Sequence, residues 1–102
     1  MSPYITYREN DEFGNLQYFI LQTAFPNYIC MLSTYPMDSI IQPVQITGYS
    51  LWLVFQGTLS GRLIPNIRNI DKEINAMMEN MAQWYYANRI APNYKRYRKF
   101  IK

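Results

Sequence analysis

The residues best suited to binding chemistry are the cations and aromatic rings near the carboxyl end of the chain. Five of the ten basic residues fall within the last eight positions, as Lys95, Arg96, Arg98, Lys99 and Lys102. Tyr94, Tyr97 and Phe100 are interleaved with them. Lysine and arginine attract phosphate and carboxylate groups, and aromatic rings give stacking surfaces to nucleic-acid bases. We therefore expect residues 92–102 to form a basic, aromatic tail that contacts a partner.

Three interpretations of this tail remain open. It could be a solubilising terminus whose rings pack on the body of the domain, a site for an acidic protein surface, or a site for single-stranded nucleic acid. Residues 1–94 hold five basic and seven acidic residues, a net charge of −2, although the whole chain carries +3. An acidic body repels a polyanion that extends beyond the tail, so we favour a protein partner over nucleic acid.

The composition argues against most catalytic chemistry. The chain has no histidine and one cysteine, Cys30, so Ser-His, Cys-His and histidine–metal sites are excluded, as is an intrachain disulfide. No phosphate-binding loop, dinucleotide fingerprint or nucleophile elbow occurs. An enzyme would have to work with Asp, Glu, Tyr, Lys or Ser alone. We therefore predict a non-enzymatic protein, with no catalytic residue, metal ligand or cofactor.

An acidic cluster precedes the first glycine. Glu9, Asp11 and Glu12 could hold a cation, but they lack the spacing and glycine placement of a calcium loop. A solvated hairpin tip is the favoured interpretation. The same carboxylates could instead meet the basic tail of another copy of the chain.

One long segment has a clear helical period. Apolar residues recur at steps of three or four, as Ile67, Ile70, Ile74, Met77, Met78, Met81 and Tyr85. This spacing predicts an amphipathic helix over 67–91 that ends before Pro92. The methionines at these positions are typical of an ordinary core rather than of an adaptable binding groove.

Two residues near the end of this helix do not fit its apolar face. At about 100° per residue, Tyr86 and Ile90 project from the polar face beside Gln83. Either the helix ends near Tyr86 and Ile90 lies in a packed turn, or both residues belong to a contact patch continuous with the tail. The predicted partner-binding residues are Tyr86, Ile90, Tyr94, Lys95, Arg96, Tyr97, Arg98, Lys99 and Phe100.

The rest of the chain is rich in strand signals. Strands are predicted over 4–9, 16–25, 28–34 and 49–55, with a short segment over 58–64 after a turn at 56–57 or 60–61. The segment 40–47 contains Pro43 and is predicted to be an edge or broken strand. Short loops favour an antiparallel meander of four to six strands. The prediction is one α+β domain over 1–102, with a sheet over 1–64, a helix over 67–91 and the tail over 92–102.

The segment 16–25 is apolar on both faces. A single helix covers only one face, so we expect a second copy or another protein to contact the other. Residues 1–10 have no signal-peptide pattern, and the apolar run 51–55 is too short to span a bilayer. Intracellular, cytoplasmic location is therefore the expectation.

Overall fold

The computed structural model describes residues 3–24, 27–59 and 70–102. The strands run as β1 Tyr4–Asn10, β2 Leu16–Gln22, β3 Tyr28–Ser33, β4 Val44–Gln45 and β5 Trp52–Thr58. The helical segments run as α1 Ile70–Tyr85, the π-helix η1 Tyr86–Ile90, the 3₁₀-helix η2 Ala91–Asn93, α2 Tyr94–Tyr97 and the 3₁₀-helix η3 Arg98–Phe100. Strands come first and helices last, which confirms the predicted α+β class.

The five described strands form one sheet. Its order is β1-β2-β3-β5-β4, and every neighbouring pair is antiparallel. The predicted edge strand is confirmed and shortened to Val44–Gln45. Pro43 directly precedes it and has no N–H group to donate, which suits the edge of a sheet. The chain thus passes from β3 to the edge before β5 returns between them, so the last two strands leave the simple meander order.

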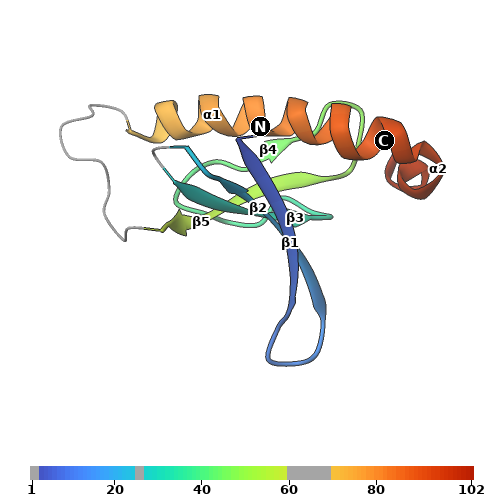
Figure 1. The fold of residues 1–102 in the computed structure, drawn as a ribbon, viewed down its shortest axis with the longest axis horizontal. Helices are drawn as coiled ribbons and strands as arrows, with labels where there is room; N and C mark the ends of the chain where they lie inside the picture. The colour runs from blue at the N-terminus through green and yellow to red at the C-terminus, as the bar shows by residue number, and fades with distance from the viewer. Residues whose placement is uncertain (1–2, 25–26, 60–69) are drawn as a thin grey trace.

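The first hairpin is longer than the sheet that supports it. β1 and β2 pair from Tyr4 opposite Gln22 to Asn10 opposite Leu16, whereas β2 pairs with β3 only over residues 18–21. Residues 9–17 therefore project from the body as a two-stranded arm, visible in Figure 1 as the loop that extends away from α1. The predicted polar turn forms the tip of this arm.

A β-bulge lies in β5 where a turn was considered. Ile29 faces Gly57 and Cys30 faces Phe55, so Gln56 is an extra residue on β5. Gly57 has φ 147°, a conformation that glycine adopts with little strain. The turn considered at 56–57 is therefore wrong. The turn considered at 60–61 and most of the segment predicted over 58–64 lie outside the described residues.

Helix α1 lies across one face of the sheet (Figure 1). Its buried side carries Ile74, Met78, Met81 and Tyr85, which confirms the predicted apolar face, while Ile67 lies outside the described residues. The strands meet it with Ile20, Cys30, Leu53 and Val44, which the pairing register places on one face. This layer between helix and sheet is the core of the domain.

The other face of the sheet is only partly covered. Met31 pairs with Val54 and Phe19 pairs with Met31, so these side chains share the face turned away from α1. Val54 is buried, and Ser39 in the loop before β4 donates a hydrogen bond to the Phe55 carbonyl at 3.2 Å. Phe19 and Met31 stay half-buried. The two-sided apolar pattern of β2 thus leaves exposed apolar surface on the face opposite the helix.

The end of the long helix departs from α-helical geometry. Over Tyr86–Ile90 the chain forms a π-helix, and the Ala91 N–H donates to the Tyr86 carbonyl, five residues earlier. The wider turn shifts the residues that follow it, and Ile90 is 0% exposed in the same core cluster as Tyr85. The prediction that Ile90 projects from the polar face is wrong, because it assumed 100° per residue throughout. Tyr86 remains 45% exposed, as predicted.

Asparagine side chains accompany this change of geometry. Asn88 Nδ2 donates to the Trp84 carbonyl at 2.9 Å, and Asn93 Nδ2 donates to the Arg89 carbonyl at 2.8 Å. In an α-helix these carbonyls would accept the backbone N–H groups of the same two asparagines, four residues on. The amide side chains therefore add hydrogen bonds at two carbonyls where the backbone bonding pattern changes. Pro92, inside η2, supplies no N–H group and is consistent with the departure from α-helical bonding.

Candidate functional site

The tail is held against the body by backbone hydrogen bonds. Ile101 forms a β-bridge with Tyr49, and the Ser50 N–H donates to the Phe100 carbonyl at 2.7 Å. The Lys102 N–H donates to the Gly48 carbonyl at 3.0 Å. Gly48 has φ 85° in the turn that precedes Tyr49, a conformation suited to glycine. The tail is therefore an integral part of the fold.

A tyrosine pair fixes the tail to the end of the long helix. The Tyr85 and Tyr97 hydroxyls lie 2.8 Å apart in a hydrogen bond, and their rings meet edge to face with centroids 6.2 Å apart. Phe100 continues the cluster, with its ring centroid 6.4 Å from that of Tyr97. Burial, and then the hydrogen bond to Tyr97, raise the pKa of Tyr85 well above its ordinary value, so this hydroxyl stays protonated at neutral pH.

Between the tail and the foot of the arm lies a groove of about 420 Å³. Its floor and walls are largely apolar or aromatic and include Leu16, Tyr18, Leu32, Tyr35, Met37 and Phe100. The charged side chains among its described lining residues are Arg96 and Lys99, and both are cations. We call this hollow the tail groove. Its volume is within the usual range of a ligand site.

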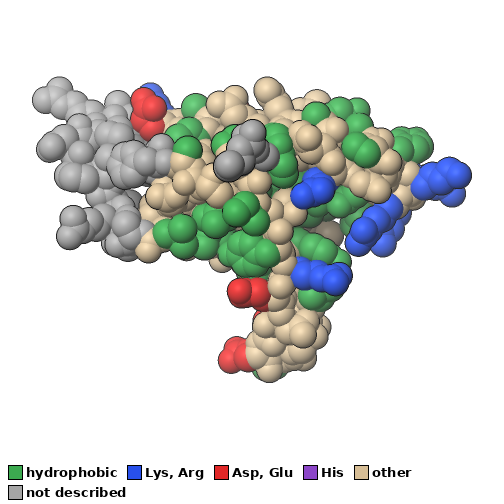
Figure 2. Space-filling view, viewed as in Figure 1, with side chains coloured by type: hydrophobic (Ala, Val, Ile, Leu, Met, Phe, Trp, Pro, Cys, Tyr) green, Lys and Arg blue, Asp and Glu red, His purple; other side chains and the backbone are tan. Residues whose placement is uncertain are grey.

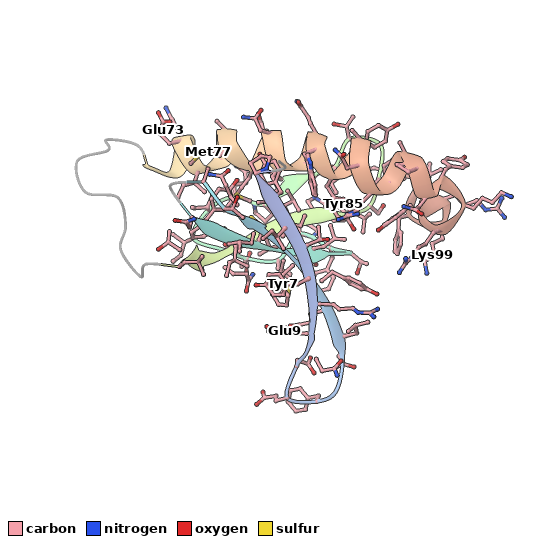
Figure 3. All side chains as sticks on the ribbon, in the orientation of Figure 1. Tyr7, Glu9, Glu73, Met77, Tyr85 and Lys99 are labelled. Carbon is pink, nitrogen blue, oxygen red and sulfur yellow. The ribbon has the colours of Figure 1, made fainter. Side chains whose placement is uncertain are left out.

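The two cations of the tail groove are not neutralised by the body. Both are exposed, and among the described residues no hydrogen bond or ion pair engages the Arg96 guanidinium or the Lys99 ammonium. Lys99 Nζ lies 5.1 Å from the centroid of the Phe100 ring. Figure 2 shows basic side chains gathered at this end of the molecule, and Figure 3 shows Lys99 on the tail and Tyr85 directed toward the sheet. The groove therefore offers positive charge above an aromatic wall.

The predicted partner-binding residues fall into three groups. Arg96, Tyr97, Lys99 and Phe100 line the tail groove together. Tyr94, Lys95 and Arg98 are exposed and do not line it, and Tyr86 lies on the other side of the helix end with its ring 6.0 Å from that of Tyr49. Ile90 is buried in the core and belongs to no exposed surface, which removes it from the predicted contact patch.

The sequence analysis did not anticipate the half of the groove that comes from the strands. Leu16 and Tyr18 from β2 are exposed, as is Tyr35 after β3. Pairing places Arg8 directly opposite Tyr18, so it lies on the same face of the hairpin as the groove. The signal was the run of apolar residues on one face of β2, because Leu16 and Tyr18 continue the face of the buried Ile20 but are themselves exposed. Nothing local, however, linked it to residues about 80 positions later.

A larger hollow of about 1010 Å³ lies between α1 and residues 42–49. Its lining is rich in amides, and two of these are engaged within the fold. Asn75 Nδ2 donates to the Gln42 carbonyl at 3.1 Å, and Gln45 Nε2 donates to the Tyr49 carbonyl at 2.9 Å. Glu79 is the one ionisable carboxyl among its described lining residues. We prefer the tail groove as the candidate site because it combines aromatic side chains with two cations that are unpaired within the described residues.

Neither a metal-binding cluster nor a membrane-spanning helix occurs in the part of the chain that is described. No group of three or more His, Cys, Asp or Glu side chains there is placed to hold a metal ion. No helix in the same residues has the length and apolar character needed to cross a bilayer. Comparison with protein-family models, with curated proteins and with solved structures finds no match for this chain.

Proposed function

We propose that the protein is a non-enzymatic interaction module that holds an acidic, aromatic-bearing segment of a protein partner in the tail groove. The observation that carries this proposal is the pair of unneutralised cations, Arg96 and Lys99, above a half-buried aromatic wall. Carboxylates would meet the cations, while an aromatic or aliphatic side chain would enter the hollow between Tyr97 and Tyr18.

The tail groove is preorganised for such a segment. Tyr97 is held by Tyr85, and the tail backbone is bonded to residues 48–50, so little of the groove has to be ordered when a partner binds. Rigid sites lose less conformational entropy on binding, which favours affinity from a small area. The apolar lining supplies most of the binding energy, and the cations select the charge of the partner.

Single-stranded nucleic acid is the second candidate. Tyr18 and Tyr35 are exposed beside the two cations, and each ring could stack on a base. The net charge of −2 over residues 1–94 opposes a polyanion that leaves the groove, whereas a short acidic peptide need not leave it. We therefore place the protein partner first.

Fluorescence anisotropy with two labelled probes tests the proposal. One probe is a synthetic peptide rich in aspartate and glutamate with a single phenylalanine, and the other is single-stranded oligothymidylate. We expect the peptide to bind more tightly at physiological salt. The double variant Arg96→Glu, Lys99→Glu should weaken peptide binding roughly tenfold or more, because two favourable charge contacts become repulsive.

The chain supplies a matched control. The double variant Lys95→Glu, Arg98→Glu changes the net charge equally on the same tail but outside the groove. If it weakens peptide binding as much as the groove variant, attraction is non-specific and the proposal is wrong. If oligothymidylate binds more tightly and Tyr35→Ala removes that preference, nucleic acid is the ligand.

A further inference from the structure

The arm ends in an ordered tip that presents an aromatic ring and a carboxylate. Asp11 accepts hydrogen bonds from the backbone N–H groups of Phe13 and Asn15, at 2.9 and 2.8 Å, and from the Asn15 side chain. These bonds, chiefly the one from the Asn15 N–H, lower the pKa of Asp11 and keep it charged. Gly14 closes the turn with φ 82°. Phe13 is left 81% exposed beside the exposed Glu12.

The arm and the tail groove have opposite charges. The arm carries the carboxylates of Glu9, Asp11 and Glu12, whereas the charged groove residues are Arg96 and Lys99. Figure 2 shows acidic side chains on the arm and basic ones at the tail end, and Figure 3 places Glu9 on the arm. A phenylalanine flanked by carboxylates is also the kind of segment that the groove lining fits.

The groove lies at the foot of the arm, which restricts how a tip can reach it. Leu16, Gln17 and Tyr18 line the groove, and Phe13 lies five residues beyond Tyr18. At about 3.4 Å per residue the tip is roughly 17 Å from the foot, so a paired hairpin cannot place its own tip in its own groove. Two arms that lie side by side in opposite directions, related by a two-fold axis, place each tip at the foot of the other. The same two-fold rotation therefore fills the groove of each copy with the arm tip of the other.

We propose that the tail groove is occupied by the arm tip of a second copy of this chain, in a two-fold dimer with exchanged arms. Phe13 of one protomer enters the aromatic hollow, and Glu12 faces Arg96 and Lys99 of its partner. This inference rests on the proposed function, since it names the occupant of the same groove. The hollow of about 420 Å³ accommodates one aromatic ring, because a cavity of about 150 Å³ already holds benzene.

Sedimentation velocity of the full chain over a wide concentration range tests self-association. Phe13→Ser should raise the dimer dissociation constant by about 100-fold, since each of the two identical contacts loses a factor of ten or more with the ring. Ile40→Ser is the matched control, because Ile40 is an equally exposed apolar residue (89%) outside the arm and the tail groove. It should leave the dissociation constant unchanged.

A charge exchange gives the sharper test. Glu12→Lys places a cation against Arg96 and Lys99 in each contact, and the double variant Arg96→Glu, Lys99→Glu places two carboxylates against Glu12, so each variant alone should associate much more weakly than the wild type. In a mixture of the two, both contacts of the mixed dimer pair opposite charges, and association should return. Arg98→Glu, outside the groove, should neither weaken association nor restore it with Glu12→Lys.

The outcomes separate this inference from the proposed function. Recovery in the mixture supports the exchanged arms. A chain that stays monomeric up to millimolar concentration, or a dimer unaffected by Phe13→Ser and by the double variant Arg96→Glu, Lys99→Glu, overturns them. In either case the acidic peptide probe is titrated into Phe13→Ser, which retains the groove. Binding there leaves the proposed function standing, and no binding refutes both.

Discussion

The substitution Ile90→Ala tests the π-helix that redirects the end of the long helix. Ile90 is fully buried in the core cluster, so removing three methyl or methylene carbons leaves a cavity there. Buried isoleucine-to-alanine changes cost about 2–5 kcal/mol of the free energy of unfolding. A domain of this size has about 5–15 kcal/mol in total, so the variant should be strongly destabilised yet folded at low temperature.

Urea unfolding followed by circular dichroism measures the effect, together with the melting temperature. At about 4–8 °C per kcal/mol, Ile90→Ala should lower the melting temperature by roughly 8 °C or more. Gln83→Ala, on the exposed polar face of the helix, should change stability by no more than about 0.5 kcal/mol. A continuous α-helix would place Ile90 on that same polar face. Equal, small effects of the two substitutions would therefore refute the π-helical register.

Three further predictions concern buried side chains. The Tyr28 hydroxyl has no hydrogen-bond partner among the described residues. Tyr28→Phe should therefore leave the free energy of unfolding unchanged or raise it by up to about 1–3 kcal/mol. A urea midpoint that falls would contradict this. The pKa of Tyr85 is raised from 10.0 in the folded state, so its contribution to the free energy of unfolding is complete below about pH 10 and declines as the pH rises further. Urea midpoints measured from pH 8 upward should show this decline, and Tyr85→Phe should reduce it. Burial hides the Cys30 thiol from solvent and raises its pKa, so a disulfide reagent should react with the thiol only in urea. Rapid reaction of the folded protein would show that the core opens.

The basic tail packs against the acidic body and is part of the same fold. Tyr97 bonds to Tyr85 and the tail backbone bonds to residues 48–50, while Arg96 and Lys99 remain exposed. Two of the interpretations considered from sequence are therefore compatible. The rings pack on the body, and the cations stay free for a partner.

The sequence alone determined the features that depend on local pattern. The steps between Ile74, Met78 and Met81 predict the buried face of α1, because an α-helix repeats every 3.6 residues and solvent exclusion acts on one side of it. Pro43 predicts a strand at the edge, because proline has no N–H and inside a sheet would leave a neighbouring carbonyl without a donor. The composition of residues 95–102 predicts the charge of the candidate site but not its shape.

Tertiary structure decided everything that depends on which distant groups meet. A π-helix that no local period indicates turns Ile90 into the core. The side-chain hydrogen bonds of Asn88 and Asn93 accompany it. Tyr18 and Arg96 line one groove because the tail folds back onto the end of the sheet, a contact between residues 78 positions apart. Local patterns report how one element divides its faces between core and solvent. The pairing of those faces is set by packing and hydrogen bonding over the whole chain, which no single segment encodes.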